Sequence, residues 1–187
     1  MRNRSSTREH DPTSLPIKPV LRFLGLFGVL LLGLSSAVSI LYLKFPAATS
    51  DFIGFTAQVV AAAASLVCDN VRLNGDLISY RAFSIRVVGE CTGLVEIVIY
   101  LAAVLSFPTS WLRRLAGVFG GTAVILIANV IRMATLLIIG ASSEYWFDIA
   151  HYYAYQVSML LLIVGAWTAW FYFAVLDKSK EPPPVSA

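Results

Sequence analysis

Four apolar segments dominate the pattern of hydrophobic and polar positions along the chain, and they lie at residues 21–43, 91–111, 115–140 and 152–176. Each is close to the roughly 20 residues that an α-helix needs to cross the hydrocarbon core of a bilayer. The second segment is the weakest of the four, because only residues 94–107 are strongly apolar. The pattern predicts an all-α integral membrane protein with about four transmembrane helices.

A further apolar stretch, residues 52–67, is uncharged and contains four consecutive alanines that begin at Ala61. It is short for a membrane span, and a crossing here would invert every later span. We therefore expect it to form a helix that lies on or near the outer membrane surface.

The character of the chain changes between residues 70 and 88. Asn74 and Gly75 form a strong turn signal, and residues 77–80 and 83–88 have the composition of strands. We predict a small β-hairpin in this region that leads directly into Cys91.

Composition supports a membrane protein with a single embedded domain. Of the 187 residues, 58% are hydrophobic and 13% are charged, whereas a soluble domain usually carries about a quarter charged residues. We assign residues 21–177 to this domain, in contact with the lipid bilayer, and residues 1–20 and 178–187 to disordered cytoplasmic tails. The net charge of +3 is small, so it indicates topology and not nucleic-acid binding.

The distribution of Lys and Arg orients the predicted spans. Basic residues occur in both tails and in the turn at Arg113 and Arg114, whereas the segment 141–151 has Glu144 and Asp148 but neither Lys nor Arg. Because basic residues favour the cytoplasmic side, both termini and that turn are predicted to be cytoplasmic. The loop before Cys91 and the segment 141–151, predicted to be a loop, then face outward.

Cys91 stands at the predicted start of the second span, at the outer interface. A free cysteine is often only a small apolar filler. A helix N-terminus, however, carries partial positive charge and unpaired N–H groups, which favour a thiolate. The N–H groups of Thr92 and Gly93 are candidates for an oxyanion hole, and Gly93 lets another chain segment approach closely. We interpret Cys91 as a candidate nucleophile.

Arg132 lies inside the third predicted span, where an arginine costs at least about 2.5–3.5 kcal/mol on insertion scales. Such a residue is functional by default, although two structural roles remain open. It can reach the outer interface, or it can pair with Glu96 of the second span, which we expect to serve helix packing and not catalysis. Asn129, one turn earlier on the same helix face, is expected to orient the guanidinium.

His151 begins the fourth predicted span at the outer interface. A histidine there is often only an interfacial polar residue, but histidine exchanges protons near neutral pH. Cys91, Arg132 and His151 together supply a thiol, a fixed cation and an acid–base group. Cys68 is predicted to be a bystander, and a disulfide with Cys91 stays open as an alternative that would mask the nucleophile. The two cysteines lack further ligands at metal-binding spacing, and no metal or cofactor is implied.

Three motifs and the hairpin before the cysteine resemble the exosortase/archaeosortase family in order and spacing. The motifs are Cys91-Thr92-Gly93-Leu94, Asn129-Val130-Ile131-Arg132, and His151 ahead of an aromatic-rich last span. The resemblance covers roughly residues 60–173 and implies that Cys91, Arg132 and His151 form a catalytic triad. Thr92 departs from the serine that is more usual in the family, and the short chain is similar to the compact bacterial members.

The resemblance implies a multipass cysteine protease or transpeptidase of the bacterial inner membrane with a periplasmic active site. Its partners would be exported proteins whose C-terminal sorting signal consists of a short motif, a transmembrane helix and a basic cluster. Cleavage would pass through a thioester on Cys91, as in systems that accompany exopolysaccharide and surface-protein export. Two alternatives stay open: a non-catalytic membrane assembly or transport subunit held by an Arg132–Glu96 pair, and a membrane thioester acyltransferase that attaches lipid to Cys91.

Overall fold

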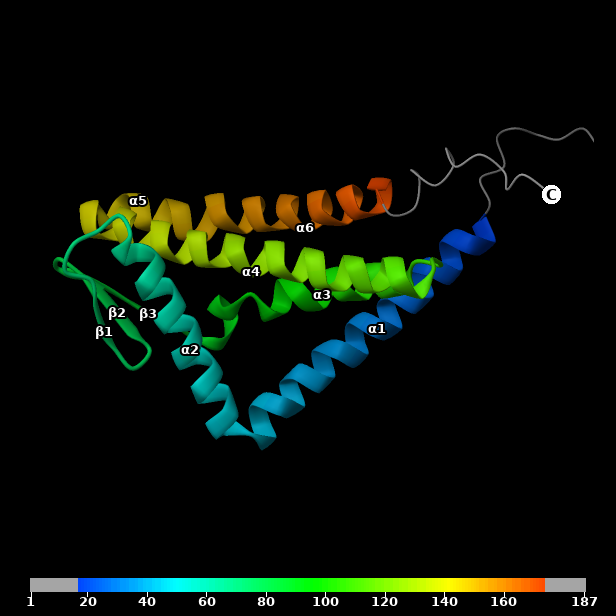
Figure 1. The fold of residues 1–187 in the computed structure, drawn as a ribbon, viewed down its shortest axis with the longest axis horizontal. Coiled ribbons are helices and arrows are strands. Elements are labelled where there is room, and N and C mark those ends of the chain that lie inside the picture. The colour runs from blue at the N-terminus through cyan, green and yellow to red at the C-terminus, as the bar shows by residue number, and fades with distance from the viewer. Residues whose placement is uncertain (1–16, 174–187) are drawn as a thin grey trace, which may run out of the picture.

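The computed structural model describes residues 17–173, which form a mostly helical protein with a small three-stranded sheet (Figure 1). Three helical segments are long and apolar enough to cross a membrane: Ile17–Lys44, Trp111–Ser142 and Glu144–Phe171. A fourth apolar helix, Leu94–Ser106, is shorter. The predicted helical membrane fold is confirmed. Most of the two predicted tails, and residues 174–176 of the fourth predicted span, lie outside the described residues.

Helices α1 (Ile17–Lys44) and α2 (Pro46–Ser65) are separated by Phe45 alone. Pro46 occupies the start of α2, where its fixed φ angle suits a first helical turn and its missing N–H costs no hydrogen bond. Helix α2 therefore begins six residues earlier than the predicted surface helix at 52–67. It is not among the helices whose length and composition suit a membrane span in the described part of the chain.

One face of α2 is buried against α4 and the sheet. The buried residues recur at helical spacing, and they are Thr56, Ala57, Val60, Ala61 and Ala64. Small side chains let the helix backbone approach its neighbours closely. The alanine run thus serves packing inside the protein, in addition to any contact that the opposite face makes with lipid.

Strands β1 (Arg72–Asn74), β2 (Leu77–Tyr80) and β3 (Phe83–Arg86) form an antiparallel sheet in the order β1-β2-β3. The predicted hairpin is present as β1 and β2. The segment predicted as a strand at 83–88 adds β3, so that the three strands form an antiparallel meander. Ile78 pairs with Ile85 across the sheet, and both are buried on the face that meets α2 and α4.

Helix α3 (Leu94–Ser106) packs between α1, α4 (Trp111–Ser142) and α6 (Tyr155–Phe171). The helices α3, α4 and α6 share a core that contains Ile97, Tyr100, Val104, Ile125, Ile163 and Trp170. The hydroxyl of Tyr100 donates to the Gly117 carbonyl oxygen over 2.9 Å. A Cβ atom at Gly121 would overlap the Tyr100 ring, so the glycine makes room for this buried aromatic side chain.

The segment 141–151 was predicted to be an outer loop, and that prediction was wrong. It contains the end of α4, helix α5 (Glu144–Ile149) and the start of a π-helical turn (η2, Ala150–Ala154) that continues into α6. Only Ser143, with an extended backbone, interrupts the helical path. Glu144, which served to orient this segment, lies in the first turn of α5, where the helix dipole favours a negative charge.

The two ends of the molecule carry different elements. The N-terminus of α1, the α3–α4 turn and the end of α6 gather at one end, and the sheet and α5 lie at the other (Figure 1). The first end is held by rings from three helices, since Phe23 lies 6.4 Å from both Phe107 and Trp167. The end with α5 is held by Phe83 of β3, which packs 4.9 Å from Phe147.

Candidate active site

Cys91 lies in a tight 3₁₀ turn, Gly89–Thr92 (η1), which follows the sheet and precedes α3. Its N–H donates to the Val88 carbonyl oxygen over 2.9 Å, and the Thr92 hydroxyl donates to the Gly89 carbonyl oxygen over 2.6 Å. Thr92 is 1% exposed, so its hydroxyl stabilises the turn. Only its backbone N–H remains as a contribution to an oxyanion site.

The structure corrects the predicted start of the second span at Cys91. Helix α3 begins at Leu94 and has 13 residues, a length of about 20 Å at 1.5 Å per residue. That is less than the roughly 30 Å of a bilayer core. The start of α3 lies near the middle of α4 and not at its end (Figure 1). The Cys91 turn is consequently set back from the end of the molecule that carries α5.

Gly93 links the turn to α3 with φ 81°. This left-handed conformation is accessible to glycine and strained for most other residues. The Asn129 side chain of α4 comes within 3.4 Å of where a Cβ atom of Gly93 would stand. Asn129 thus packs against Gly93 at ordinary contact distance, and the close approach of another chain at this glycine stays a prediction.

Asn129 holds the backbone of Cys91 from the neighbouring helix α4. Its side-chain Nδ2 donates to the Cys91 carbonyl oxygen over 2.8 Å, and the residue is 1% exposed. The prediction that Asn129 orients Arg132 was wrong, because Oδ1 of Asn129 is buried without a hydrogen-bond partner in the described structure. The amide of Asn129 reaches the Cys91 carbonyl oxygen because α4 packs directly beside the 3₁₀ turn.

Tyr42 of α1 covers the other side of the turn. Its hydroxyl lies 3.5 Å from the Gly89 carbonyl oxygen. A Cβ atom at Gly89 would stand 2.7 Å from the Tyr42 ring, so this contact requires glycine. Sequence reasoning missed both residues. The available signal was a glycine two positions before a candidate nucleophile.

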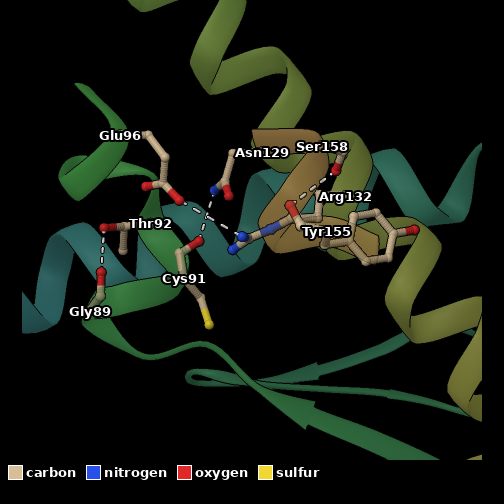
Figure 2. A network of polar contacts seen from close by, with 8 residues as sticks. All are labelled: Gly89, Cys91, Thr92, Glu96, Asn129, Arg132, Tyr155 and Ser158. Atoms are coloured by element: carbon tan, nitrogen blue, oxygen red, sulfur yellow. Dashed lines mark hydrogen bonds and ion pairs between the residues drawn. The ribbon is translucent and has the colours of Figure 1, made fainter. Parts of the chain in front are cut away.

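Arg132 follows Asn129 by one turn of α4 and faces the same region. Figure 2 shows the side chains of Glu96, Asn129 and Arg132 converging on the turn that carries Cys91. Nη1 of Arg132 lies 3.8 Å from Oε1 of Glu96, and each side chain is 15% exposed. The predicted pairing of Arg132 with Glu96 is therefore present as an ion pair between α4 and α3.

This ion pair is longer than a charge-assisted hydrogen bond, which spans about 2.7–2.9 Å. Nε of Arg132 and Oε2 of Glu96 are both buried without a hydrogen-bond partner. Leaving a buried polar atom unpaired costs about 1–3 kcal/mol. The site thus holds a guanidinium with unused donors beside the cysteine turn, which is the arrangement needed to bind a carbonyl oxygen or an anion.

His151 lies in the π-helical turn η2 and is exposed. Its ring stacks on Phe147, with centroids 5.4 Å apart and planes inclined by 7°. Phe147 and Cys91 pack against the same hydrophobic core. No hydrogen bond joins His151 to Cys91 or Arg132 within residues 17–173. The structure thus places Arg132 beside the turn that carries Cys91 (Figure 2), whereas His151 stacks on Phe147, which packs against the same core as Cys91.

The site combines a thiol with groups that can bind a carbonyl oxygen. Cys91 is a partly exposed free thiol, and Cys68 is a buried free thiol. No group of three or more His, Cys, Asp or Glu in the described region could hold a metal ion. A thiol, a guanidinium with unused N–H donors and a nearby imidazole can carry out acyl transfer.

An apolar groove of about 410 Å³ runs between α2 and α4 and reaches the cysteine turn. The polar residues in its lining are Thr56, Thr92 and Asn129. Its apolar walls include Phe52, Phe55, Val59, Leu126 and Val130. The groove offers an apolar segment a path to the vicinity of Cys91.

Comparison with known proteins identifies the family of this chain. The family described as Transmembrane exosortase (Exosortase_EpsH) matches residues 18–172, which include the cysteine turn, α4 and the π-helical turn. No curated protein and no solved structure matches the chain significantly. The family match spans most of the chain and all three candidate catalytic residues. The chain therefore belongs to the transmembrane exosortase family, whose members have a role in processing sorting signals at the membrane.

Proposed function

We propose that the protein is a membrane cysteine protease and transpeptidase in which Cys91, Arg132 and His151 carry the chemistry. The observation that carries this proposal is the hydrogen bond from Asn129 to the Cys91 carbonyl oxygen. That bond fixes the thiol-bearing turn one helical turn away from Arg132. The bond would stabilise the turn with any side chain at position 91, and its weight for the proposal is that it holds the thiol-bearing turn beside the arginine.

In the proposed mechanism, His151 removes the proton of the Cys91 thiol, and the thiolate attacks the scissile carbonyl carbon. The negative charge that develops on the carbonyl oxygen is stabilised by Arg132 and by the N–H groups of Thr92 and Gly93. His151 then protonates the leaving amine, which departs and leaves a thioester on Cys91. An acceptor nucleophile attacks the thioester, transfers the exported protein to itself and frees the thiol.

The proposed substrates are exported proteins with a C-terminal motif, one transmembrane helix and a basic cluster. The groove between α2 and α4 supports this class, because it is mostly apolar and its lining includes Thr92, the residue next to the nucleophile. An apolar helix has to approach within the plane of the membrane, while the motif that precedes it reaches the cysteine turn. The short helix α3 supports the same path for the substrate. Because α3 is short, the turn that carries Cys91 lies away from the end of the protein that carries α5.

We further propose that the cysteine turn opens to the periplasm of a bacterial inner membrane. The end of the molecule opposite the sheet carries Lys18, Arg22, Arg113 and Arg114. Basic residues favour the cytoplasmic side. The side chains of Tyr145 and Trp146 are exposed at the end of the molecule that carries α5. Such aromatic rings are enriched at membrane–water interfaces, which fits the periplasmic face of the inner membrane.

A membrane-impermeant maleimide applied to spheroplasts tests this orientation. In a Cys68→Ala background, Cys91 is expected to react without permeabilisation. The matched control is Ser110→Cys in the α3–α4 turn, in a chain without the native cysteines, and it should react only after permeabilisation. Labelling of Ser110→Cys with protection of Cys91 would reverse the proposed sidedness.

A covalent intermediate on Cys91 separates the proposed transpeptidase from a thioester acyltransferase. The purified protein is mixed with a tagged substrate and quenched in acid, and the peptide that contains Cys91 is analysed by mass spectrometry. We expect an added mass equal to the substrate fragment N-terminal to the cleaved bond, and its loss on treatment with hydroxylamine. A fatty acyl mass on Cys91 would instead identify an acyltransferase.

One observation favours a second candidate function, a non-catalytic assembly or transport subunit. The Arg132–Glu96 ion pair joins α4 to α3 and is compatible with a purely structural link between these helices. On that interpretation the pair would tolerate an exchange of its two charges.

A further inference from the structure

Glu96 is a partly buried carboxylate that the proposed mechanism does not use. It lies in the first turn of α3, five residues after Cys91. A negative charge is favoured at this helix position by the dipole. Its side chain points toward α4 and the Arg132 guanidinium (Figure 2). The carboxylate and the nucleophile therefore belong to one short segment, and both meet α4 through that segment.

The contacts of the pair differ from those of a structural link. A carboxylate and a guanidinium that serve only to join two helices gain most from two parallel short hydrogen bonds. Here a single approach of 3.8 Å joins them. Five buried side-chain polar atoms lack a hydrogen-bond partner in the described residues, and three of them surround the cysteine turn: Glu96 Oε2, Asn129 Oδ1 and Arg132 Nε. These unpaired donors and acceptors lie where a substrate carbonyl and amide would enter.

We propose that Glu96 is a positioning residue that acts through Arg132. Its charge keeps the guanidinium beside the cysteine turn, and the long separation leaves the N–H donors of Arg132 free for the reacting carbonyl oxygen. The inference deepens the proposed function and rests on it for the identity of that carbonyl. Glu96 itself touches neither the thiol nor the substrate in this scheme.

The physical need for such a residue follows from the side chain of arginine. Its long aliphatic stem allows the charged group to extend toward the membrane surface, where it is better solvated. Within residues 17–173 no hydrogen bond restrains the Arg132 guanidinium. The charge on Glu96 is the interaction that opposes this outward movement.

The rate at which iodoacetate alkylates Cys91 tests the inference without any substrate, because the guanidinium beside the turn can bind the carboxylate of this reagent. The full-length protein is purified in a Cys68→Ala background, so that only one thiol reacts. Removing a nearby negative charge would by itself ease the approach of this anion and speed alkylation. We expect Glu96→Gln to slow alkylation by about tenfold, because the guanidinium that binds the carboxylate of the reagent is released from the turn. In an Arg132→Ala background, Glu96→Gln should cause no further slowing.

Two controls separate positioning from packing. Because Gln has the shape of Glu, thermal unfolding of the Glu96→Gln protein in detergent is expected to be unchanged. Glu144→Gln removes an exposed carboxylate on α5 and should leave the rate of alkylation unchanged. Glu96→Asp keeps the charge on a shorter stem and should react at a rate between those of the parent protein and Glu96→Gln. If Glu96→Gln does not fold, Glu96→Asp decides the matter by the same comparison.

Unchanged or faster alkylation in folded Glu96→Gln, or an equal effect of that change in the Arg132→Ala background, would overturn the inference. In turnover of a cleavable substrate, Glu96→Gln should lower kcat and leave KM within about twofold, because only transition-state stabilisation is lost. If Cys91→Ala protein still cleaves substrate, the proposed function fails, whereas the alkylation result stands. The two failures are therefore distinguishable.

Discussion

Replacing Cys91 by alanine is expected to lower cleavage of a sorting-signal substrate by at least about 10³-fold, because loss of a nucleophile removes the covalent route. The turn itself should survive. Its hydrogen bonds use the backbone of Cys91, which accepts from Asn129 and donates to Val88, and neither needs the thiol. The measurement is cleavage of a tagged substrate by purified protein in detergent or in vesicles, followed by gel shift.

Cys68→Ala is the matched control for this experiment. Cys68 is a buried free cysteine outside the proposed machinery, so its loss should leave cleavage within about twofold of the parent protein, since such residues do not touch the transition state. Binding of the substrate to Cys91→Ala protein should persist, which shows that the variant is folded. Full cleavage by Cys91→Ala protein would end the assignment of the nucleophile.

Replacing Arg132 by alanine is expected to lower kcat/KM by about 10²–10³-fold, the size of effect that follows loss of one oxyanion donor. The charge-exchanged variant, with Arg132→Glu and Glu96→Arg, should remain equally inactive. The exchange keeps an ion pair between α3 and α4 but moves the guanidinium from α4 to α3, where it no longer projects from the helix position next to Asn129. Kinetics of substrate cleavage by both variants provide the measurement.

The same pair of variants distinguishes the second candidate function. If the ion pair only joins two helices, exchanging its charges restores activity to within about tenfold of the parent protein, as expected for coupled residues in a double-mutant cycle. Such a rescue would contradict a role for Arg132 in the chemistry. Arg113→Gln, which removes a basic residue near the other end of α4, is the control for a general effect of charge and should leave kcat/KM unchanged.

Most of the membrane character was predictable because hydropathy is a local property. Three long apolar helices follow from runs of residues that lipid or a helix core must accept, and the structure has them at Ile17–Lys44, Trp111–Ser142 and Glu144–Phe171. The strand at 83–86 was also anticipated from composition. The helical nature of 141–151 was not, because these residues lie between two long apolar segments, and the six residues of α5 are too few to show a helical period.

The candidate site was predictable as a set of residue types but not as a set of contacts. An arginine within an apolar run and a cysteine at the predicted start of a helix draw attention on chemical grounds alone. That Asn129 binds the Cys91 carbonyl oxygen and not the guanidinium depends on which side of α4 meets the 3₁₀ turn. That packing involves residues 38 positions apart, and no periodicity within either helix specifies it.

The sequence by itself determined that this protein belongs in a membrane, which segments are apolar enough to lie there and which three residues are chemically out of place. These properties depend on the free energy of transferring each segment from water to lipid. Residues that are close in space but distant in sequence change that free energy little. Only the tertiary structure decided that α3 is short, that Asn129 and Tyr42 hold the cysteine turn from two helices, and that Arg132 meets Glu96 through a single long contact. Those features arise from packing between helices distant in sequence, where a shift of one residue exchanges one partner for another.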